Sequence, residues 1–365
     1  MSEIKQRKFS HIRTCLEYDV QARNITAGFE DIHLVHQALP DFSLDDVNVS
    51  ISFFDKDLSA PILIEAMTGG TEEAALINTQ LAQTADSLNI AMGVGSQRAA
   101  IENSELAYTY EVARENAPNA FLIANLGVSQ FVSDYGILEA REAIKMIKAD
   151  ALAIHLNPLQ EAVQPNGDTI FTGAYKKISD LVPQIHVPVI AKETGAGISA
   201  ELAKKLEKAG FEGIDVGGAG GTSFAGVEAL RAKDSSHHYH AELGTVFWDW
   251  GIPTVPSVFE VKHSTDLTLI ASGGIRSGID IAKAIALGAK VTGVAFPLLK
   301  PAMESSESIS ERVKDFIGQL KTAMFLTGAR DLLELKNKPI VITGKTRDWL
   351  LSRGFNLTKY ERRLN

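Results

Sequence analysis

Apolar and polar residues follow two different rhythms along this chain from residue 61 onward. Eight short, nearly continuous apolar runs begin at residues 61, 90, 121, 151, 188, 213, 267 and 291. Between them lie stretches in which apolar residues recur every three or four positions, among them 72–89, 138–150, 199–210 and 277–289. A fully apolar run is typical of a strand buried on both faces, and the wider spacing is typical of a helix with one buried face. The pattern therefore predicts eight strands, each followed by a helical segment.

Regular alternation of strand and helix predicts parallel strands joined by right-handed crossovers, which is an α/β fold. Eight such units favour a single closed (β/α)8 barrel, the TIM barrel, over residues 61–365. A doubly wound open sheet is the alternative. Residues 1–60 lack the alternation, and we expect them to form an N-terminal extension, with a short helix near 9–17, that packs on the barrel. Residues 229–250 form a long insertion after the sixth strand, which is typical of a lid or a subunit contact.

Composition and charge narrow the class of protein. Hydrophobic residues make up 45% and charged residues 22% of the chain, as in a globular protein with a sizeable core. Cys15 is the only cysteine, which excludes an internal disulfide and a cysteine-rich metal site. We see neither a signal peptide nor an apolar run of about 20 residues that could cross a membrane, so we expect a cytoplasmic protein. The net charge of −9 argues against nucleic-acid binding, and an anionic ligand would need cations gathered locally.

Polar or glycine-rich residues stand where nearly every predicted strand ends. In parallel α/β folds the ligand lies at the carboxyl ends of the strands, so this is where a site is expected. The strand ends are 67–70, 96–98, 125, 155–161, 192–194, 217–222, 273–276 and 295–296.

Three of these ends are rich in glycine. The segment 271–289 places two glycines and an arginine before a helix, where backbone N–H groups and the helix dipole can hold a phosphate. The segment 214–224 supplies four glycines and Thr222, which predicts a second phosphate or cofactor contact. The segment 192–200 matches GxGxxA, a weak dinucleotide fingerprint without the expected acidic partner. Tight turns are the alternative explanation for each.

The segment HLNPLQE, residues 155–161, has two compatible interpretations. Asn157 can cap a helix that begins at Pro158, with Glu161 near the positive end of its dipole. Glu161 can also bind a divalent cation through oxygen while Asn157 and Gln160 reach a ligand. His155 either lines the site or is hydrogen-bonded at the end of the strand.

Several basic residues could bind an anion if the fold brings them together. Lys192 ends the fifth strand and Arg98 follows the second, while Arg7, Lys8 and His11 lie near the N-terminus. Read one at a time, each is more often a solvated surface charge.

The motifs RKFSH, AMTGG, GVGSQR, ANLG, HLNPLQE, AKETGAGIS, GGAGGTSF and SGGIRSGIDIAKAIALGA, in this order, resemble the type 2 isopentenyl diphosphate isomerases, and most closely the archaeal members. The resemblance runs from about residue 6 to at least residue 300. It implies a TIM barrel that binds FMN, uses it reduced, needs Mg2+ and takes NADPH as the initial reductant. It also implies interconversion of isopentenyl and dimethylallyl diphosphate by a homo-oligomer, a tetramer or an octamer.

Carried over by motif, the resemblance implies roles for individual residues. Flavin contacts would come from Ala66, Met67, Thr68, Ser96, Asn125, Lys192, Thr222, Gly274, Ile275, Arg276, Ala295 and Phe296. Substrate contacts would come from Arg7, Lys8, His11, Ser96, Gln97, Arg98, Asn157 and Gln160. Glu161 would hold Mg2+. Gln160 beside the hydrocarbon, Lys192 beside the anionic flavin, and His155 form the expected catalytic group; Phe224 receives no role.

Two alternative functions stay open at this point. Another FMN-dependent barrel oxidoreductase would require a histidine and arginine pair for a carboxylate, or a cysteine on a barrel loop. A non-catalytic flavin- or phosphate-binding protein would retain FMN without turnover, and it would leave the cluster at 155–161 unexplained.

Overall fold

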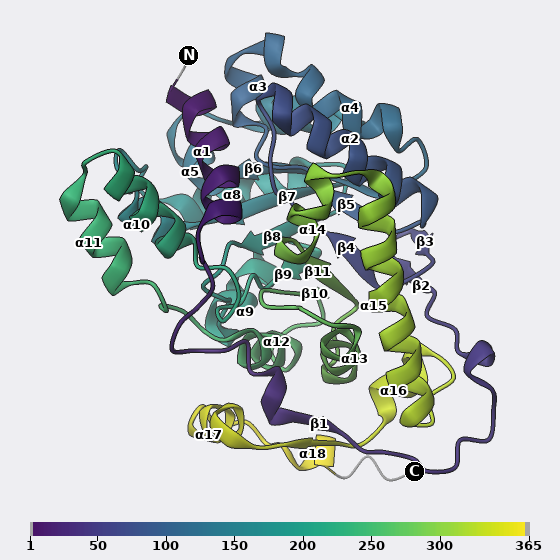
Figure 1. The fold of residues 1–365 in the computed structure, drawn as a ribbon. Helices are drawn as coiled ribbons and strands as arrows, with labels where there is room; N and C mark the ends of the chain where they lie inside the picture. Colours follow the sequence, from purple (N-terminus) through teal and green to yellow (C-terminus); the bar gives the residue numbers. More distant parts are fainter. Residues whose placement is uncertain (1–2, 362–365) are drawn as a thin grey trace.

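Eight parallel strands close into a barrel at the centre of the molecule (Figure 1). In a computed structural model, residues 3–361 are described, with side chains for 10–358 and for Tyr360. Each neighbouring pair is parallel, and the ring closes where Gly293 of the last barrel strand pairs with Leu63 of the first. The TIM barrel predicted from the sequence is therefore confirmed, and the open sheet is excluded. The barrel strands are β4 (Ile62–Ile64), β5 (Ala91–Gly93), β6 (Leu122–Gly127), β7 (Ala151–Leu156), β8 (Val189–Glu193), β9 (Gly213–Asp215), β10 (Thr268–Ser272) and β11 (Val291–Val294).

Helices follow every strand and cover the outside of the barrel. Their apolar faces pack on the strands to form the main core, which agrees with the three-or-four spacing. They are α2 (Glu72–Ser87), α3 (Arg98–Glu102), α4 (Tyr108–Asn116), α5 (Val128–Ser133), α6 (Ile137–Met146), α7 (Pro158–Val163), α8 (Ala174–Leu181), α9 (Ala200–Lys208), α10 (Phe224–Asp234), α11 (His238–Val246), α12 (Thr254–Lys262), α13 (Gly278–Leu287), α14 (Phe296–Leu299) and α15 (Ser306–Leu326). Short 3-10 helices lie at Ser104–Leu106, Val182–Gln184 and Pro301–Met303.

A hairpin from the N-terminal extension packs against the residues inside the barrel. Strands β2 (Ile51–Phe53) and β3 (Lys56–Leu58) pair antiparallel. The fully buried Phe53 and the neighbouring Leu58 join a second core cluster made of inward-facing barrel residues such as Leu63 and Ile270. Since β4 begins only four residues after Leu58, the hairpin lies at the amino ends of the strands and leaves the opposite end open.

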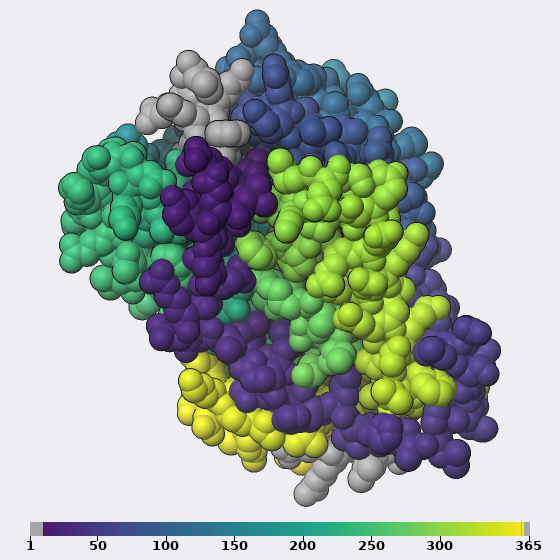
Figure 2. All heavy atoms as spheres, viewed as in Figure 1, coloured from purple at the N-terminus to yellow at the C-terminus, as the bar shows by residue number. Residues whose placement is uncertain are grey.

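The N-terminal extension and the C-terminal segment are joined by one pair of strands. Strand β1 (Ile32–Leu34) pairs antiparallel with β12 (Ile340–Ile342), so the extension and the C-terminal segment form one small sheet. Figure 2 shows the N-terminal segment crossing the surface from α10 and α11 towards the C-terminal helices. The remaining elements are α1 (Glu3–Glu17), the 3-10 helices Phe29–Asp31 and Leu44–Asp46, α16 (Leu332–Asn337), α17 (Gly344–Ser352) and α18 (Thr358–Glu361).

Two local expectations differ from the structure. The N-terminal helix is longer than 9–17, because α1 begins at Glu3. The segment 229–250 is not an open loop: it contains the end of α10 and all of α11, and the two helices pack side by side. Within the described part of the chain, every helix is too short or too polar to span a membrane.

Candidate active site

A cavity of about 240 Å³ opens at the carboxyl ends of the barrel strands. It is lined by most of the residues singled out in the sequence, namely His11, Ala66, Met67, Thr68, Ser96, Arg98, Asn125, His155, Asn157, Gln160, Glu161, Lys192, Thr222, Gly274, Ile275, Arg276, Ala295 and Phe296. The backbone of Arg7 and Lys8 lies in α1, but their side chains are outside the described set. Phe224 also lines the cavity, with its ring edge-on to His11 at 6.4 Å between centroids.

Gln97 is absent from the cavity lining. Its side chain is fully buried, and Nε2 donates to the Ala143 carbonyl at 2.8 Å. Its Oε1 accepts from the backbone N–H of Asn125 at 2.9 Å. The side chain therefore holds the end of β6 in place and does not face the cavity, contrary to the contact expected from the sequence.

Asn125 sets the orientation of His155. Asn125 Nδ2 donates to the Val94 carbonyl at 3.1 Å, so its Oδ1 is the acceptor that faces His155 Nδ1 at 2.8 Å. This arrangement places a proton on Nδ1 of His155. His155 thus both lines the cavity and is hydrogen-bonded at the strand end, which joins the two alternatives considered from the sequence.

Lys192 lines the cavity and lies between two buried carboxylates. Its Nζ is 2.6 Å from Glu65 Oε2 and 2.5 Å from Asp215 Oδ2. Burial alone would lower the pKa of Lys192, but Asp215 and Glu65 outweigh it and raise that pKa above its ordinary value. Lys192 is therefore a permanent positive charge at this end of the barrel, and neither of its two partners could be identified from the sequence.

The cluster that follows β7 is organised around Glu161. Helix α7 begins at Pro158, as predicted, but Asn157 does not cap it. Instead Asn157 Nδ2 donates to Glu161 Oε1 at 2.9 Å. Glu161 Oε2 accepts from the backbone N–H of Asp168 at 2.8 Å and from the Gln164 amide. Both amide oxygens, Asn157 Oδ1 and Gln164 Oε1, are buried with no hydrogen-bond partner among the described residues.

The loop after α7 is held tightly against this cluster. Asp168 also accepts from Arg98 Nη1 at 2.9 Å, which connects Arg98 to the Glu161 network. A Cβ at Gly167 would lie only 1.9 Å from the Glu161 carbonyl oxygen, so the loop requires glycine there. Among the side chains that the structure describes, no three from His, Cys, Asp or Glu are close enough to hold a metal together. A cation bound at this cluster would therefore have one carboxylate, that of Glu161, and neutral oxygen atoms as its ligands.

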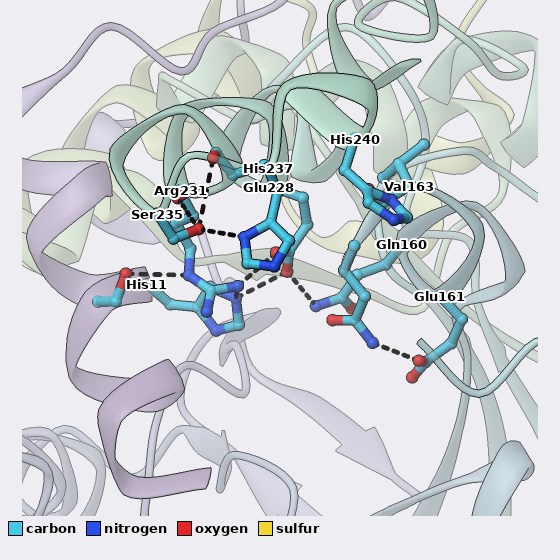
Figure 3. A network of polar contacts seen from close by, with 12 residues as sticks. His11, Gln160, Glu161, Val163, Glu228, Arg231, Ser235, His237 and His240 are labelled. Carbon is cyan, nitrogen blue, oxygen red and sulfur yellow. Dashed lines mark hydrogen bonds and ion pairs between the residues drawn. The ribbon is translucent and has the colours of Figure 1, made fainter. Parts of the chain in front are cut away.

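Helix α1 reaches the cavity through His11 (Figure 3). His11 Nε2 lies 2.7 Å from Glu228 Oε1, and Glu228 also accepts from Gln160 Nε2 at 3.1 Å. Arg231 pairs with Glu228 and donates from Nε to Ser10 Oγ at 2.9 Å. Burial by itself would raise the pKa of Glu228, but His11, Arg231 and Gln160 outweigh it and lower that pKa to about 2. The ionised Glu228 therefore connects α1, α7 and α10.

Sequence reasoning missed Glu65, Glu228 and Arg231. Glu228 offered one signal: it is a charged residue in the otherwise small and apolar stretch FAGVEALRA, with an arginine three positions later. A buried acid on a helix requires a partner, and spacing of three brings the two side chains to one face. Glu65 follows ILI directly, but nothing in its neighbourhood distinguishes it from a residue at the end of a strand.

The glycine-rich loops pack closely around the cavity. A Cβ at Gly221 would lie 2.4 Å from the Gly274 nitrogen, so the loops after β9 and β10 need glycine where they meet. The GxGxxA segment has a different use. Four successive N–H groups, of residues 194–197, donate to Oε2 of the buried Glu193 at 2.5–3.1 Å. These donors are directed at the protein's own carboxylate and not at a phosphate.

A family match assigns this barrel to a class of flavoproteins. Residues 160–342 match the family of FMN-dependent dehydrogenases. The fold is shared by a mandelate oxidase variant with an FMN adduct (TM-score 0.63, 15% identity, 94% of this chain and 99% of that one). A lactate oxidase of Pediococcus acidilactici is similar (TM-score 0.64, 15% identity, 92% and 94%). At this identity the likeness shows the fold alone.

More similar relatives identify the family. The isopentenyl-diphosphate delta-isomerases of Methanosarcina mazei (48% identity; 96% of each chain), Methanothermobacter thermautotrophicus (49%; 99% of each) and Thermococcus kodakarensis (50%; 95% of this chain, 94% of that one) match almost throughout. The chain belongs to the isopentenyl-diphosphate delta-isomerase family, and the resemblance found in the sequence is confirmed.

Proposed function

We propose that this protein interconverts isopentenyl and dimethylallyl diphosphate, with FMN and a divalent cation bound in the strand-end cavity. The observation that carries the proposal is the set of oxygens around Glu161 in a protein of this family. Asn157 Oδ1 and Gln164 Oε1 are buried without partners beside a fixed carboxylate, which costs free energy unless a cation or another ligand completes the site.

The donor set suits a hard cation such as Mg2+. Mg2+ prefers oxygen ligands and is usually bound through one or two carboxylates together with water and substrate phosphate. Glu161 would be its protein ligand, with the two amide oxygens next to it. Arg98, His11 and Ser96 line the same cavity and would meet the diphosphate. Arg7 and Lys8, on the same helix as His11, complete the proposed set of substrate contacts.

The opposite side of the cavity suits FMN. Lys192 and Arg276 supply positive charge, and the loops containing Thr222 and Gly274 bring backbone close to a ligand. The other proposed contacts are Ala66, Met67, Thr68, Ser96, Asn125, Ile275, Ala295 and Phe296. When bound and reduced, FMN supplies an electron-rich ring and an exchangeable proton to the reaction.

The reaction adds a proton at one end of a three-carbon unit and removes another at the far end, without net redox change. An alkene is a very weak base, so the chain must hold the hydrocarbon in place and exclude water. Gln160 is fixed for this task, because Nε2 donates to the ionised Glu228 and Oε1 accepts from Asn157 Nδ2 at 3.3 Å. Lys192 holds positive charge at the flavin, and His155 lines the remaining wall.

Three further features belong to the proposal. NADPH would reduce the flavin initially, and the protein would act in the cytoplasm. It would form a tetramer or an octamer. Large apolar side chains that are exposed on and after α11, namely Tyr239, Val246 and Trp250, offer surface that a second copy could bury.

The direct test is an anaerobic assay on the purified protein with FMN, reductant, Mg2+ and isopentenyl diphosphate. We expect dimethylallyl diphosphate to form only when both the reduced flavin and the cation are present. Equal turnover with oxidised flavin would contradict the role of reduced FMN. Oxidation of a 2-hydroxy acid would support an FMN-dependent oxidoreductase instead, and retention of reduced FMN with no turnover of either substrate would favour a binding protein.

A further inference from the structure

The buried charges around Lys192, in the wall of the cavity, do not balance. One ammonium, that of Lys192, faces the two carboxylates of Glu65 and Asp215. The exposed fractions of these side chains are 13%, 7% and 2%. Charges removed from water interact strongly and are costly to leave uncompensated. With both acids ionised, the group carries one excess negative charge inside the barrel.

The two carboxylates are not equally satisfied. Asp215 Oδ1 accepts a hydrogen bond from Ser272 Oγ in addition to the contact between Oδ2 and Lys192. Glu65 Oε1 is buried and has no partner among the described residues. The neighbouring Gly293 lets this oxygen pack closely, because a Cβ at that position would lie 1.7 Å from Glu65 Oε1. A proton is therefore accommodated best on Glu65, since an unpaired carboxylate oxygen in an apolar site favours the neutral form.

Few other titratable groups bear on Glu65. Strands β4, β5, β6, β10 and β11 contain none. Strand β7 contributes His155, which is held by Asn125, and β8 contributes Glu193, which is held by its own loop. Burial and Asp215 raise the pKa of Glu65 to about 7, although Lys192 opposes them. Near neutral pH the carboxyl group of Glu65 is therefore able to gain or lose a proton.

We propose that Glu65 is a positioning residue that takes up one proton when negative charge develops beside Lys192. The inference rests on the proposed function, in the part that places FMN next to this lysine. Reduction brings two electrons and one proton to the flavin, as a hydride from a hydride donor or as two electrons from dithionite with a proton from solvent, and the reduced flavin is then an anion. One further proton, from solvent, goes to Glu65. Lys192, shared between two acids before reduction, is then shared between Asp215 and the flavin, so the net charge of the group is the same before and after reduction.

The test is the pH dependence of the midpoint potential of the bound flavin between pH 7.5 and 9, in wild type and in Glu65→Gln. Because the slope is proportional to the number of protons taken up per electron, the variant should show about half the wild-type slope. Glu193→Gln removes the neighbouring buried carboxylate and should keep the wild-type slope. Equal slopes in wild type and Glu65→Gln would overturn the inference.

A measurement on the wild type alone guards against a variant that does not fold. The reduced-minus-oxidised infrared difference spectrum should gain a band from a protonated carboxyl group, and its absence would overturn the inference. If the wild type isomerises its substrate but shows neither effect, only this inference fails. If the wild type does not bind FMN, the proposed function fails and the inference falls with it.

Discussion

Glu161 illustrates how a single residue can be held ready for a ligand. Asn157, Gln164 and the Asp168 backbone all donate to its carboxylate. These donors fix the two oxygens while the amide oxygens beside them stay unpaired. The supporting hydrogen bonds therefore exist before a ligand binds. Because Glu161 is already held in place, less conformational entropy is lost on binding.

Replacing Glu161 by Gln should weaken Mg2+ binding at least about 100-fold, because removal of a direct ligand costs no less than loss of a supporting contact. Activity should fall with it, while the yellow colour of bound FMN remains. Titration of the protein with Mg2+ under assay conditions measures the first effect, and the absorption spectrum measures the second. Glu105→Gln, on the exposed surface, is the control. Loss of FMN from Glu161→Gln would show that the residue has been assigned to the wrong ligand.

At this scale the sequence predicted residue types better than it predicted contacts. His155, Asn157, Gln160 and Glu161 were singled out because polar residues at a strand end need a reason. Gln97 looked equally suitable, but it faces Ala143 and Asn125 because the start of α3 turns it inwards. Whether such a side chain faces the cavity or the protein interior depends on how neighbouring elements are rotated relative to one another. No local sequence pattern encodes that rotation.

Among the elements, the loop after β8 depends most on one buried acid. Glu193 accepts the N–H groups of residues 194–197, and that loop forms part of the cavity wall through Thr194 and Gly195. Burial raises the pKa of Glu193 to about 7 in spite of these four donors. The sequence showed the glycines of this loop but not the direction in which their neighbours' N–H groups point.

A pH-dependent stability should follow from Glu193. Its folded pKa is about 7 against an ordinary value of 4.5, so between these values the folded state binds more protons than the unfolded state. The contribution of Glu193 to the free energy of unfolding is therefore fully present below about pH 4.5. It decreases by about 3 kcal/mol as the pH rises to about 7. Glu193→Gln should show a flatter profile in urea unfolding over this range. A profile as steep as that of the wild type would contradict the assignment.

The contact between α1 and α10 depends on Arg231. It donates to Ser10 Oγ and lies 3.0 Å from His11 Nε2 through Nη1. Arg231→Gln should loosen α1, so that its amides exchange faster with solvent. The KM for isopentenyl diphosphate should rise about tenfold, which is the order of one charge-assisted hydrogen bond. FMN affinity should not change.

Arg13 provides a matched control on the same helix. It pairs with Glu17 on the exposed side, so Arg13→Gln should leave both amide exchange and KM unchanged. If Arg231→Gln lowers kcat with no effect on KM or on exchange in α1, the residue acts elsewhere than at this contact.

For the whole molecule, the barrel was the most predictable feature. Eight apolar runs separated by amphipathic segments leave few topologies open, because parallel strands buried on both faces need helices around them. The pairing of β1 with β12 and the position of the β2–β3 hairpin could not be predicted in this way. The first joins two segments about 300 residues apart, and the second depends on contacts of Phe53 and Leu58 with distant barrel residues such as Ile270; neither has a periodic signature of its own.

The hairpin should contribute to stability and not to the site. Phe53 is fully buried against barrel residues such as Phe121, with 5.0 Å between ring centroids. Phe53→Ala should lower the free energy of unfolding by about 3–5 kcal/mol, the usual cost of deleting a buried aromatic ring. Leu39→Ala, at a position that is 91% exposed in the same extension, should change it by less than about 0.5 kcal/mol. FMN affinity should be equal in both variants, and a loss confined to Phe53→Ala would show that the hairpin supports the site.

The central claim is that this cavity moves protons on an isoprenoid diphosphate, and isomerisation in D2O tests it most directly. The protein with reduced FMN and Mg2+ should convert isopentenyl diphosphate into dimethylallyl diphosphate that carries solvent deuterium in a methyl group, detected by NMR. The same sample without reductant should give no labelled product. Failure of the reduced, Mg2+-loaded protein to form any dimethylallyl diphosphate, or formation of product without solvent deuterium, would contradict the account.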